Sequence, residues 1–271
     1  MMGRLTLGTP TEYPQEYAPE VLFPVDRATA RKELGLGDDL PFQGKDIWNA
    51  WELTWLDSSG KPVIATATIV VDAHSPNIIE SKSLKLYLNA FAMSRQDSPA
   101  ALEATISADL SGIAGTAVDV AIITGSATGQ TAISDFPGDC VDMLSIGSSS
   151  SAVDAGLLGN ENEEIVTEEL HSHLLRSLCP VTGQPDFGSV LIRYRGPRIR
   201  RASVLDYIVS FRQHQDFHEA CVERMYMDIK KCCGPEDLTV YARYTRRGGL
   251  DINPFRSDFE SEAENLRLWR Q

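Results

Sequence analysis

The sequence predicts an α+β protein made of two copies of one unit, each an antiparallel β-sheet covered by a pair of helices. The order strand, strand, helix, helix, strand occurs twice along the chain, and a Ser/Gly/Asn/Glu-rich stretch without periodicity separates the two occurrences. We therefore expect an N-terminal module over residues 1–147, a linker over 148–164 and a C-terminal module over 165–271.

In the first copy, β-branched and aromatic residues predict strands, and apolar residues at helical spacing predict helices. The expected elements are strands over residues 46–57 and 63–72, helices over 81–94 and 99–110, and a strand over 117–124. Ser98 and Pro99 fit the N-cap and first position of the second helix. Residues 1–44, rich in Pro, Gly and acidic side chains, predict a surface arm with a short helix near 27–34.

The second copy repeats this order. Its expected elements are strands over residues 166–178 and 189–194, helices over 203–213 and 217–231, and a strand over 238–244. The pattern of residues 87–91 matches that of 207–211, and residues 102–104 match 218–220. Shared architecture alone can also produce so weak a match, but a duplication would let two copies with different polar residues supply different halves of one site.

Composition excludes several classes of protein. With 25 basic and 38 acidic residues, the net charge of -13 repels a nucleic-acid backbone, so we expect no polynucleotide partner. No apolar run reaches the roughly 18 residues that span a bilayer, and the first residues lack a basic and then apolar leader pattern. These features predict a soluble, cytoplasmic protein with no membrane partner.

The five cysteines are odd in number and form no CxxC pair, which favours reduced thiols over a disulfide framework. His171 and His173 alternate along an expected strand and share one of its faces. No cysteine or carboxylate pattern in the sequence completes a ligand set for them, so we predict no metal.

The segment ESKSLKLY at residues 80–87 opens the first helix of the first copy. Its apolar positions face one way, which places Lys82, Lys85 and Asn89 together on another face. Two lysines beside serine hydroxyls and helix N-terminal amides suit a phosphate group. A solvated Lys/Ser face after an acidic N-cap explains the same pattern.

The segment SLCPVTGQPDFG at residues 177–188 is a Pro/Gly-bounded turn after a strand. It holds Cys179 close to Asp186 in the sequence, a thiol nucleophile beside a carboxyl group. That carboxyl group donates a proton at neutral pH only where its surroundings favour the neutral form. The alternative is a buried structural cysteine with an aspartate that caps turn amides.

The segment DFHE at residues 216–219 begins the last long helix. Asp216 and Glu219 fit a capping box, in which Glu219 serves only the helix end. Alternatively, His218 and Glu219 bind the ring edge of a heterocycle from the first turn.

Five arginines between residues 193 and 201 form a dense basic run in an acidic protein, and Arg246 with Arg247 forms a second cluster before two glycines. Such arginines pair with surplus carboxylates or bind a phosphorylated small molecule. The run consists of Arg193, Arg195, Arg198, Arg200 and Arg201.

Taken together and in this order, ESKSLKLY (80–87), SLCPVTGQPDF (177–187) and FHE (217–219) closely resemble segments of the NADPH-dependent 7-cyano-7-deazaguanine reductases. These are the nitrile reductases of queuosine biosynthesis, a tRNA modification, here in the long two-module form. The resemblance implies tandem tunnelling-fold (T-fold) modules, assembly into a homodimer, and reduction of a nitrile to an aminomethyl group with two NADPH.

The resemblance also implies roles for individual residues. Cys179 would add to the nitrile carbon as a thioimide, Asp186 would deliver protons to the nitrogen, and His218 would orient substrate or pass protons. Glu80 and Glu219 would bind the deazaguanine base, and Phe217 would shield the adduct from water. The cofactor residues would be Ser81, Lys82, Ser83 and Lys85.

No glycine-rich dinucleotide fingerprint follows an expected strand, so NADPH would bind in another geometry. Two other functions stay open from the sequence. One is a cysteine-dependent nitrile hydrolase that delivers water instead of hydride, and the other is a non-catalytic purine or pterin binding module on the same fold.

Overall fold

The structure is a computed structural model that describes residues 13–125, 132–147, 150 and 152–271. Its chain forms two compact units. The N-unit comprises Met1–Ala28, Ile47–Thr131 and Arg246–Asp251, and the C-unit comprises Thr29–Asp46, Ala132–Thr245 and Ile252–Gln271. The two units are thus interleaved along the sequence, whereas the module boundaries predicted at 147 and 165 stay a prediction. Residues 1–12 of the predicted arm and 148, 149 and 151 of the predicted linker lie outside the described residues.

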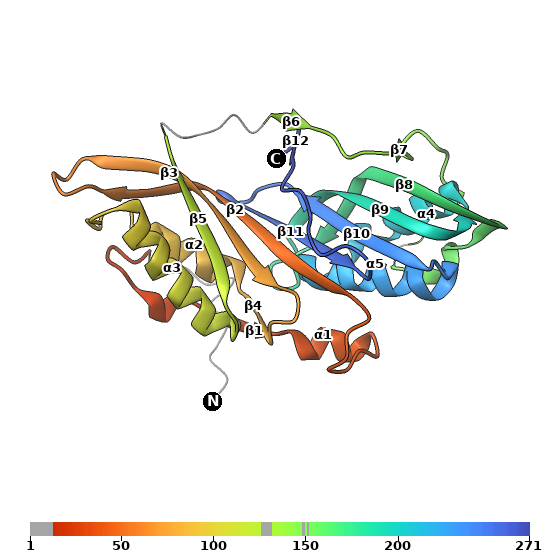
Figure 1. The fold of residues 1–271 in the computed structure, drawn as a ribbon, viewed down its shortest axis with the longest axis horizontal. Coiled ribbons are helices and arrows are strands. Elements are labelled where there is room, and N and C mark those ends of the chain that lie inside the picture. Colours follow the sequence, from red (N-terminus) through yellow and green to blue (C-terminus); the bar gives the residue numbers. More distant parts are fainter. Residues whose placement is uncertain (1–12, 126–131, 148–149, 151) are drawn as a thin grey trace. The chain divides into compact units, whose positions relative to one another are not determined.

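The N-unit contains a sheet in which β5, β3 and β2 are neighbours in that order, with β3 and β5 antiparallel. Two helices, α2 and α3, lie on one side of these strands (Figure 1). The elements are η1 (Pro19–Val21), β1 (Pro24–Asp26), α1 (Arg27–Glu33), β2 (Gln43–Leu56), β3 (Pro62–Asp72), β4 (Asn77–Ile79), α2 (Ser81–Asn89), α3 (Pro99–Ala114) and β5 (Val118–Thr124); β2 and α1 each extend into the C-unit. The short strands β1 and β4 pair antiparallel.

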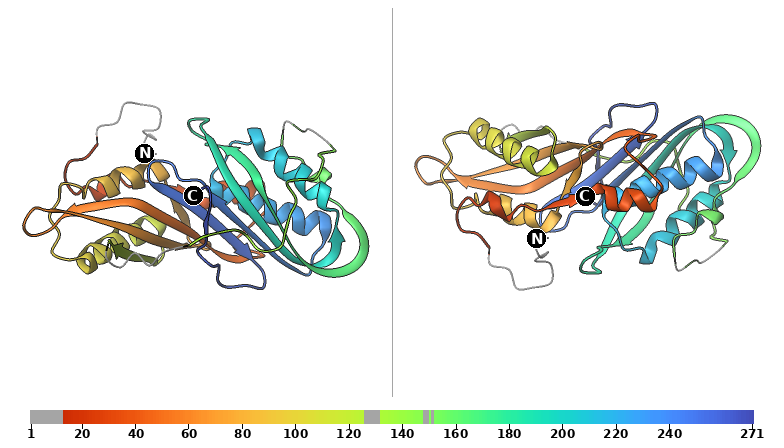
Figure 2. Two further views of the ribbon diagram at one scale, coloured as in Figure 1. Left: turned by 90° about the horizontal axis from the view of Figure 1, so that it is seen from above. Right: turned by 90° about the horizontal axis from the view of Figure 1, so that it is seen from below.

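The C-unit is built around the strand order β11, β10, β9, β8, β7. Its long strands pair antiparallel, and the two-residue β7 joins β8 in parallel. Helices α4 and α5 lie side by side over one face of this sheet (Figure 2), and apolar side chains from both fill the core beneath them. The elements are β6 (Ile133–Ser134), β7 (Asp139–Cys140), η2 (Ala155–Leu157), β8 (Asn160–Leu178), β9 (Pro185–Ile199), α4 (Arg201–Ser210), η3 (Phe211–Gln213), α5 (His218–Cys233), β10 (Asp237–Tyr244), β11 (Leu250–Ser257) and β12 (Arg267–Leu268).

These elements confirm the α+β class and the repeated order of antiparallel strands and paired helices. The predicted strands and helices are present, most of them with ends shifted by a few residues. The largest shift is at β8, which begins at Asn160, inside the predicted linker. No helix in the described part of the chain combines the length and apolarity needed to cross a bilayer.

A tyrosine–aspartate hydrogen bond joins the two helices of each unit. The Tyr87 hydroxyl in α2 donates to Asp109 in α3 over 2.5 Å, and the Tyr207 hydroxyl in α4 donates to Asp228 in α5 over 2.6 Å. Burial raises the pKa of both tyrosines, and the neighbouring carboxylates add to the shift, so both hydroxyls keep their protons. This shared contact supports the match between residues 87–91 and 207–211.

The second helices of the two units also correspond, but in a different register from the predicted one. Each has 16 residues and ends before a glycine with positive φ, Gly115 or Gly234. Pro99 is the first residue of α3 and His218 the first of α5. The predicted match of residues 102–104 with 218–220 is therefore displaced by three residues.

The described part of the predicted surface arm is not a surface arm. Leu22 and Phe42 are buried, and so are Arg27 and Arg31 on α1. In the N-unit, the Arg27 backbone amide donates to Pro76 and its guanidinium to Ser75, which anchors this end of the segment. The surface-arm prediction was wrong for these residues because it rested on charged composition, and arginine side chains can be buried when they have partners.

A buried ion cluster holds the C-unit together. Arg256 is fully buried and lies 2.9 Å from Glu223 and 2.8 Å from Asp46. Glu223 also accepts two hydrogen bonds from Arg31. Burial alone would lower the pKa of Arg256, but Asp46 and Glu223 raise it, so the guanidinium stays charged. Two guanidinium groups and two carboxylates thus balance inside the protein and connect α1, β2, α5 and β11.

We expect Glu223→Gln to destabilise the protein by about 3–5 kcal/mol, because it leaves buried arginine charge without its carboxylate. Glu262→Gln is the matched control, since Glu262 pairs with Lys45 at an exposed position and should change stability by less than about 1 kcal/mol. Urea unfolding followed by circular dichroism measures both. Equal effects of the two substitutions would contradict the importance of the buried cluster.

Candidate active site

Cys179 lies at the tip of the β8–β9 hairpin in the C-unit. Its amide donates to Gln184 over 2.9 Å, and the Gly183 amide donates to the Cys179 carbonyl over 3.0 Å. Gly183 has a positive φ of 68°, which glycine adopts without strain. The turn therefore fixes the backbone on both sides of a partly exposed thiol.

Two backbone hydrogen bonds tie this turn to the segment before α5. The Leu178 amide donates to His214 over 2.7 Å, and the Asp216 amide donates to Leu178 over 3.1 Å. The residue before Cys179 and the residues before Phe217 are thus paired like adjacent strands. This contact brings two motifs separated by about forty residues into one place.

Asp186 lies in β9 opposite Ser177, rather than in the turn where the sequence suggested it. Its side chain is buried, and its Oδ2 is 3.4 Å from Nε2 of His218, the first residue of α5. The His218 ring lies 3.9 Å from the Tyr244 ring, centroid to centroid, with an angle of 33° between them. Carboxylate and phenol ring thereby hold the imidazole from two sides.

Tyr244 and Gly188 were not predicted as site residues. They are paired across β10 and β9, and a Cβ on Gly188 would lie only 3.1 Å from the Tyr244 ring. Gly188 thus leaves room for the ring that contacts His218. The sequence shows a glycine directly after Asp186 and Phe187, but only the pairing of β9 with β10 shows that this glycine accommodates the Tyr244 ring.

A second cysteine, Cys221, lies on the buried face of α5. Burial raises the pKa of this thiol well above its usual value, and Asp216 adds to the shift, so it stays protonated. Burial likewise raises the pKa of Tyr244, with Cys221 as the next contribution. Of these two thiols, Cys179 is the more accessible one and the better candidate nucleophile.

The predicted capping box at the start of α5 is not formed. Phe217 is the N-cap residue and has no side-chain cap, while Asp216 accepts a hydrogen bond from the Phe217 amide. Glu219 is in the first turn and is 3% exposed. A buried carboxyl group beside His218 and a half-buried phenyl ring thus lie on the same first turn as the imidazole.

In the N-unit, Glu80 is the N-cap of α2. Its Oε1 accepts from the Lys82 amide over 2.9 Å, and its Oε2 accepts from the Ser83 amide over 2.7 Å. The Ser83 hydroxyl donates to the Glu80 carbonyl and accepts from the Phe23 amide. The acidic N-cap anticipated from the sequence is present, so these two helix amides are already engaged by a carboxylate.

A pocket of about 230 Å³ lies beside α2 in the N-unit. Lys85 and Asn89, which the sequence placed on one helix face, both line it, together with Glu52, Gly248 and Gly249. Lys82 is not among its lining residues.

The glycines of this pocket form a tight turn with φ values of 56° and 75°. A Cβ on Gly248 would lie 3.2 Å from Lys85, and one on Gly249 would lie 2.7 Å from Glu52. The bare backbone therefore makes room for the pocket's charged side chains. Next to the turn, the Arg246 guanidinium lies over the Trp51 ring at 5.3 Å.

Four arginines of the basic run are paired with carboxylates in the C-unit. Arg193 contacts Glu169 and Glu260, and Arg198 contacts Glu164 and Glu168. The remaining pairs are Arg195 with Glu236 and Arg201 with Asp139 and Glu168. This arrangement favours the structural explanation of the run over a phosphate site.

The C-unit therefore defines a candidate cysteine-dependent enzyme, in which a partly exposed thiol accompanies a buried carboxyl group and the imidazole beside it. Sequence comparisons identify the kind of enzyme. A family described as "Nitrile reductase, 7-cyano-7-deazaguanine-reductase N-term" matches residues 13–122, and one described as "QueF-like protein" matches residues 185–263.

Two curated relatives extend the match to nearly the whole chain. One, from Desulfotalea psychrophila, is 52% identical over 98% of this chain and 97% of its own length. The other, from Dechloromonas aromatica, is 53% identical over 98% of this chain and 94% of its own length. Both are named NADPH-dependent 7-cyano-7-deazaguanine reductase. The chain belongs to this family.

Among solved structures, the apo form of the archaeosine synthase QueF-Like aligns with 37% of this chain and 96% of its own. The TM-score is 0.31 and the identity 17%, a likeness too weak to carry an argument.

Proposed function

We propose that this chain reduces 7-cyano-7-deazaguanine to 7-aminomethyl-7-deazaguanine with two NADPH. The observation that carries the chemistry is the position of the Cys179 turn, which is hydrogen-bonded to the segment before His218. His218 in turn contacts the buried carboxyl group of Asp186. The family membership selects a nitrile as the electrophile for this thiol.

The thiol of Cys179 adds across the nitrile triple bond. A carbon–sulfur bond forms as one carbon–nitrogen π bond breaks, and the nitrogen gains the proton, which gives a thioimide. NADPH supplies the hydrides when bound, one to the thioimide carbon and one to the following imine carbon. The first releases the Cys179 sulfur, and with one proton taken up in each reduction the nitrile becomes a primary amine.

In this proposal, Asp186 donates protons to the substrate nitrogen and His218 helps to transfer them. Asp186 is buried, and its contact with His218 gives a route by which a proton lost to the substrate nitrogen is replaced. Tyr244 keeps the imidazole in the plane that allows this contact. The burial of the pair also keeps bulk water from hydrolysing the thioimide and the imine.

The base is recognised by carboxylates. Glu219 is buried in the same first turn as His218, and a carboxylate suits the adjacent N–H groups of a guanine-like edge. Glu80 also has acceptor capacity, since each carboxylate oxygen can accept more than the one amide it already binds. Phe217 is half-buried and covers the adduct as an apolar lid.

The cofactor is assigned to the residues around α2. Lys85 lines the pocket beside the glycine turn, and its ammonium group suits a phosphate of the cofactor. Lys82, one turn away, adds positive charge. Ser81 belongs to the same first turn, and Ser83 acts by fixing the Glu80 backbone rather than by offering a free hydroxyl. A homodimer and a cytoplasmic location stay predictions.

Mixing enzyme and substrate without NADPH should give a covalent adduct on Cys179, detected by intact mass spectrometry. We expect Cys179→Ala to show no adduct and to lose NADPH consumption at least about 1,000-fold, because the nucleophile is gone. Cys232→Ser, at an exposed cysteine elsewhere on α5, should keep both. A wild-type enzyme that releases ammonia without consuming NADPH would instead identify a nitrile hydrolase.

Asp186→Asn should bind substrate with little change but lose turnover about 100- to 10,000-fold, the usual contribution of a positioned acid. Calorimetric titration measures the binding, and NADPH oxidation measures the turnover. Glu236→Gln, which removes an exposed carboxylate from an arginine pair, is the control and should retain full activity. Unchanged turnover in Asp186→Asn would remove this residue from the mechanism.

The double variant Lys82→Ala/Lys85→Ala should raise the KM for NADPH at least about tenfold, which corresponds to about 1.4 kcal/mol of lost binding. Adduct formation on Cys179 needs no cofactor and should persist. Lys61→Ala, in the exposed turn between β2 and β3, provides the control. An unaltered KM for NADPH would place the cofactor elsewhere.

A further inference from the structure

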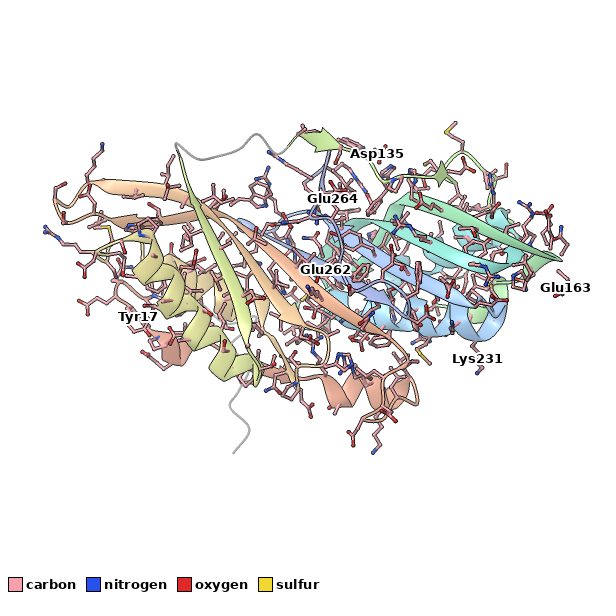
Figure 3. All side chains as sticks on the ribbon, viewed as in Figure 1. Tyr17, Asp135, Glu163, Lys231, Glu262 and Glu264 are labelled. Carbon is pink, nitrogen blue, oxygen red and sulfur yellow. The ribbon has the colours of Figure 1, made fainter. Side chains whose placement is uncertain are left out.

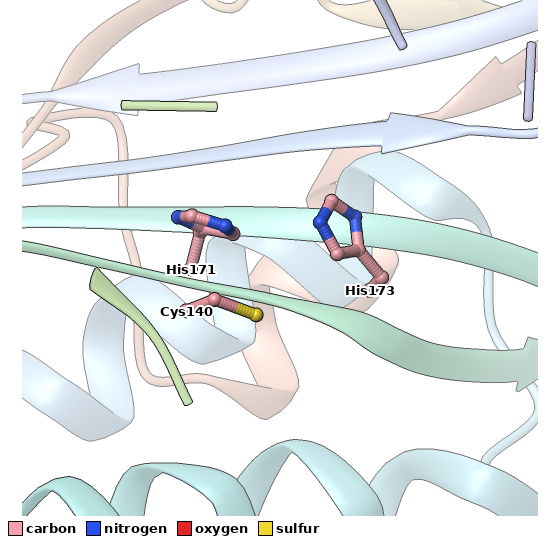
Figure 4. A group of neighbouring side chains, drawn as sticks. All are labelled: Cys140, His171 and His173. Carbon is pink, nitrogen blue, oxygen red and sulfur yellow. The ribbon is translucent and has the colours of Figure 1, made fainter. Parts of the chain in front are cut away.

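Three potential metal ligands meet on the C-unit's sheet, away from Cys179. Cys140 in β7 pairs with His171 in β8, and His173 follows two residues later on the same strand. One donor atom from each side chain lies within 4.8 Å of the other two. Figure 4 shows the thiol and the two imidazoles as neighbours on these strands.

The cluster occupies the sheet face opposite α4 and α5. His171 pairs with Leu191, and paired residues on antiparallel strands point to the same face. Leu191 packs with Phe136 and Tyr241, whereas the next strand residue, Ile192, packs into the core under the helices. The sequence offered no third ligand for the two histidines because Cys140 is about thirty residues away and becomes their neighbour only through β7.

The histidines are oriented as metal ligands usually are. His171 Nδ1 is 3.0 Å from the Pro137 carbonyl, which can only accept, so Nδ1 carries the hydrogen and Nε2 keeps its lone pair. His173 Nδ1 is 2.8 Å from the Ser189 hydroxyl. Contacts of this kind on one ring nitrogen orient the other toward a metal.

A fourth ligand is available next to His173. The Asp135 carboxylate is 3.2 Å from His173 Nε2 and is largely exposed. Two ligand atoms that share one tetrahedral metal at about 2.0 Å lie about 3.3 Å apart, so this pair already has the required spacing. The donor atoms of Cys140, His171 and His173 lie within 4.8 Å of one another, so they need to approach by at most about 1.5 Å, which the exposed Cys140 side chain allows.

We propose that Cys140, His171 and His173 bind one zinc ion, with Asp135 as the fourth ligand. A thiolate, two imidazoles and a carboxylate form a mixed set of the borderline type that zinc prefers, whereas magnesium and calcium prefer oxygen atoms alone. Four protein ligands would close the coordination shell, as in a structural site.

The ion would fasten the segment around β7 to the sheet. This segment pairs with β8 through Asp139 and Cys140, and Val141 and Asp142 form further hydrogen bonds with the same strand. Asp135, next to β6 and labelled in Figure 3, and Cys140 are both exposed, so the ion can enter from solvent. None of the four ligands belongs to the proposed catalytic set, so the site is independent of the nitrile chemistry.

Cobalt(II) substitution tests the site on the full-length chain after chelation and under reducing conditions. Tetrahedral cobalt bound to a thiolate gives intense visible bands and a sulfur-to-metal charge-transfer band, and zinc abolishes both. We expect one equivalent of cobalt to produce these bands in the wild type. Absence of the bands would overturn the proposal.

Variants locate the ion. Cys140→Ser should lose the charge-transfer band, and His173→Gln should weaken cobalt binding at least about tenfold, measured by competition with a chromophoric chelator. Cys232→Ser and Cys179→Ala are the matched cysteine controls and should bind like the wild type. A band that persists in Cys140→Ser, or that disappears in Cys179→Ala, would overturn the site.

His74→Gln is the matched histidine control. His74 contacts Asp72 at an exposed position of the N-unit and could hold cobalt adventitiously. Retained affinity in this variant supports the proposed ligands. A loss as large as that in His173→Gln would contradict them.

Discussion

The two hydrogen bonds at Leu178 are the constraint on which the candidate site depends. They connect the end of β8 to the segment before α5, and so fix Cys179 relative to the first turn that carries Phe217, His218 and Glu219. Backbone hydrogen bonds suit this purpose because they hold the two segments together without using a side chain. The imidazole is then adjusted locally, by Asp186 on one side and by the Tyr244 ring on the other.

The two units share a scaffold but differ in the polar groups at the start of their helices. Each joins its helix pair through a tyrosine hydroxyl and an aspartate. At the start of α2, however, the carboxylate of Glu80 binds the helix's own amides, whereas α5 begins without a side-chain cap and buries Glu219 in its first turn. The repeated fold thus places a carboxylate at the start of each of these helices, but only Glu80 caps its helix.

Much of this could be predicted from the sequence, because local patterns specify strands, helices and turns. The hairpin at Cys179 and the acidic cap at Glu80 belong to this local class. What was missed depends on contacts between distant residues. The polar, proline-containing β11 has no strand pattern, yet it is buried throughout. Arg31 falls in the predicted surface arm, and its burial depends on Glu223, which is remote in the sequence. Tyr244 has a role only through its pairing with Gly188.

The interleaving of the chain has a consequence for its origin and its division. A fragment cut at the predicted linker would keep the Arg256–Glu223 pair but lose Asp46 and Arg31. Half of the buried ion cluster would then be missing from its interior. The compact C-unit therefore includes Thr29–Asp46, which a C-terminal fragment would lack. If the chain arose by duplication, the copies did not stay separate along the sequence, because an N-terminal segment became part of the second copy's interior.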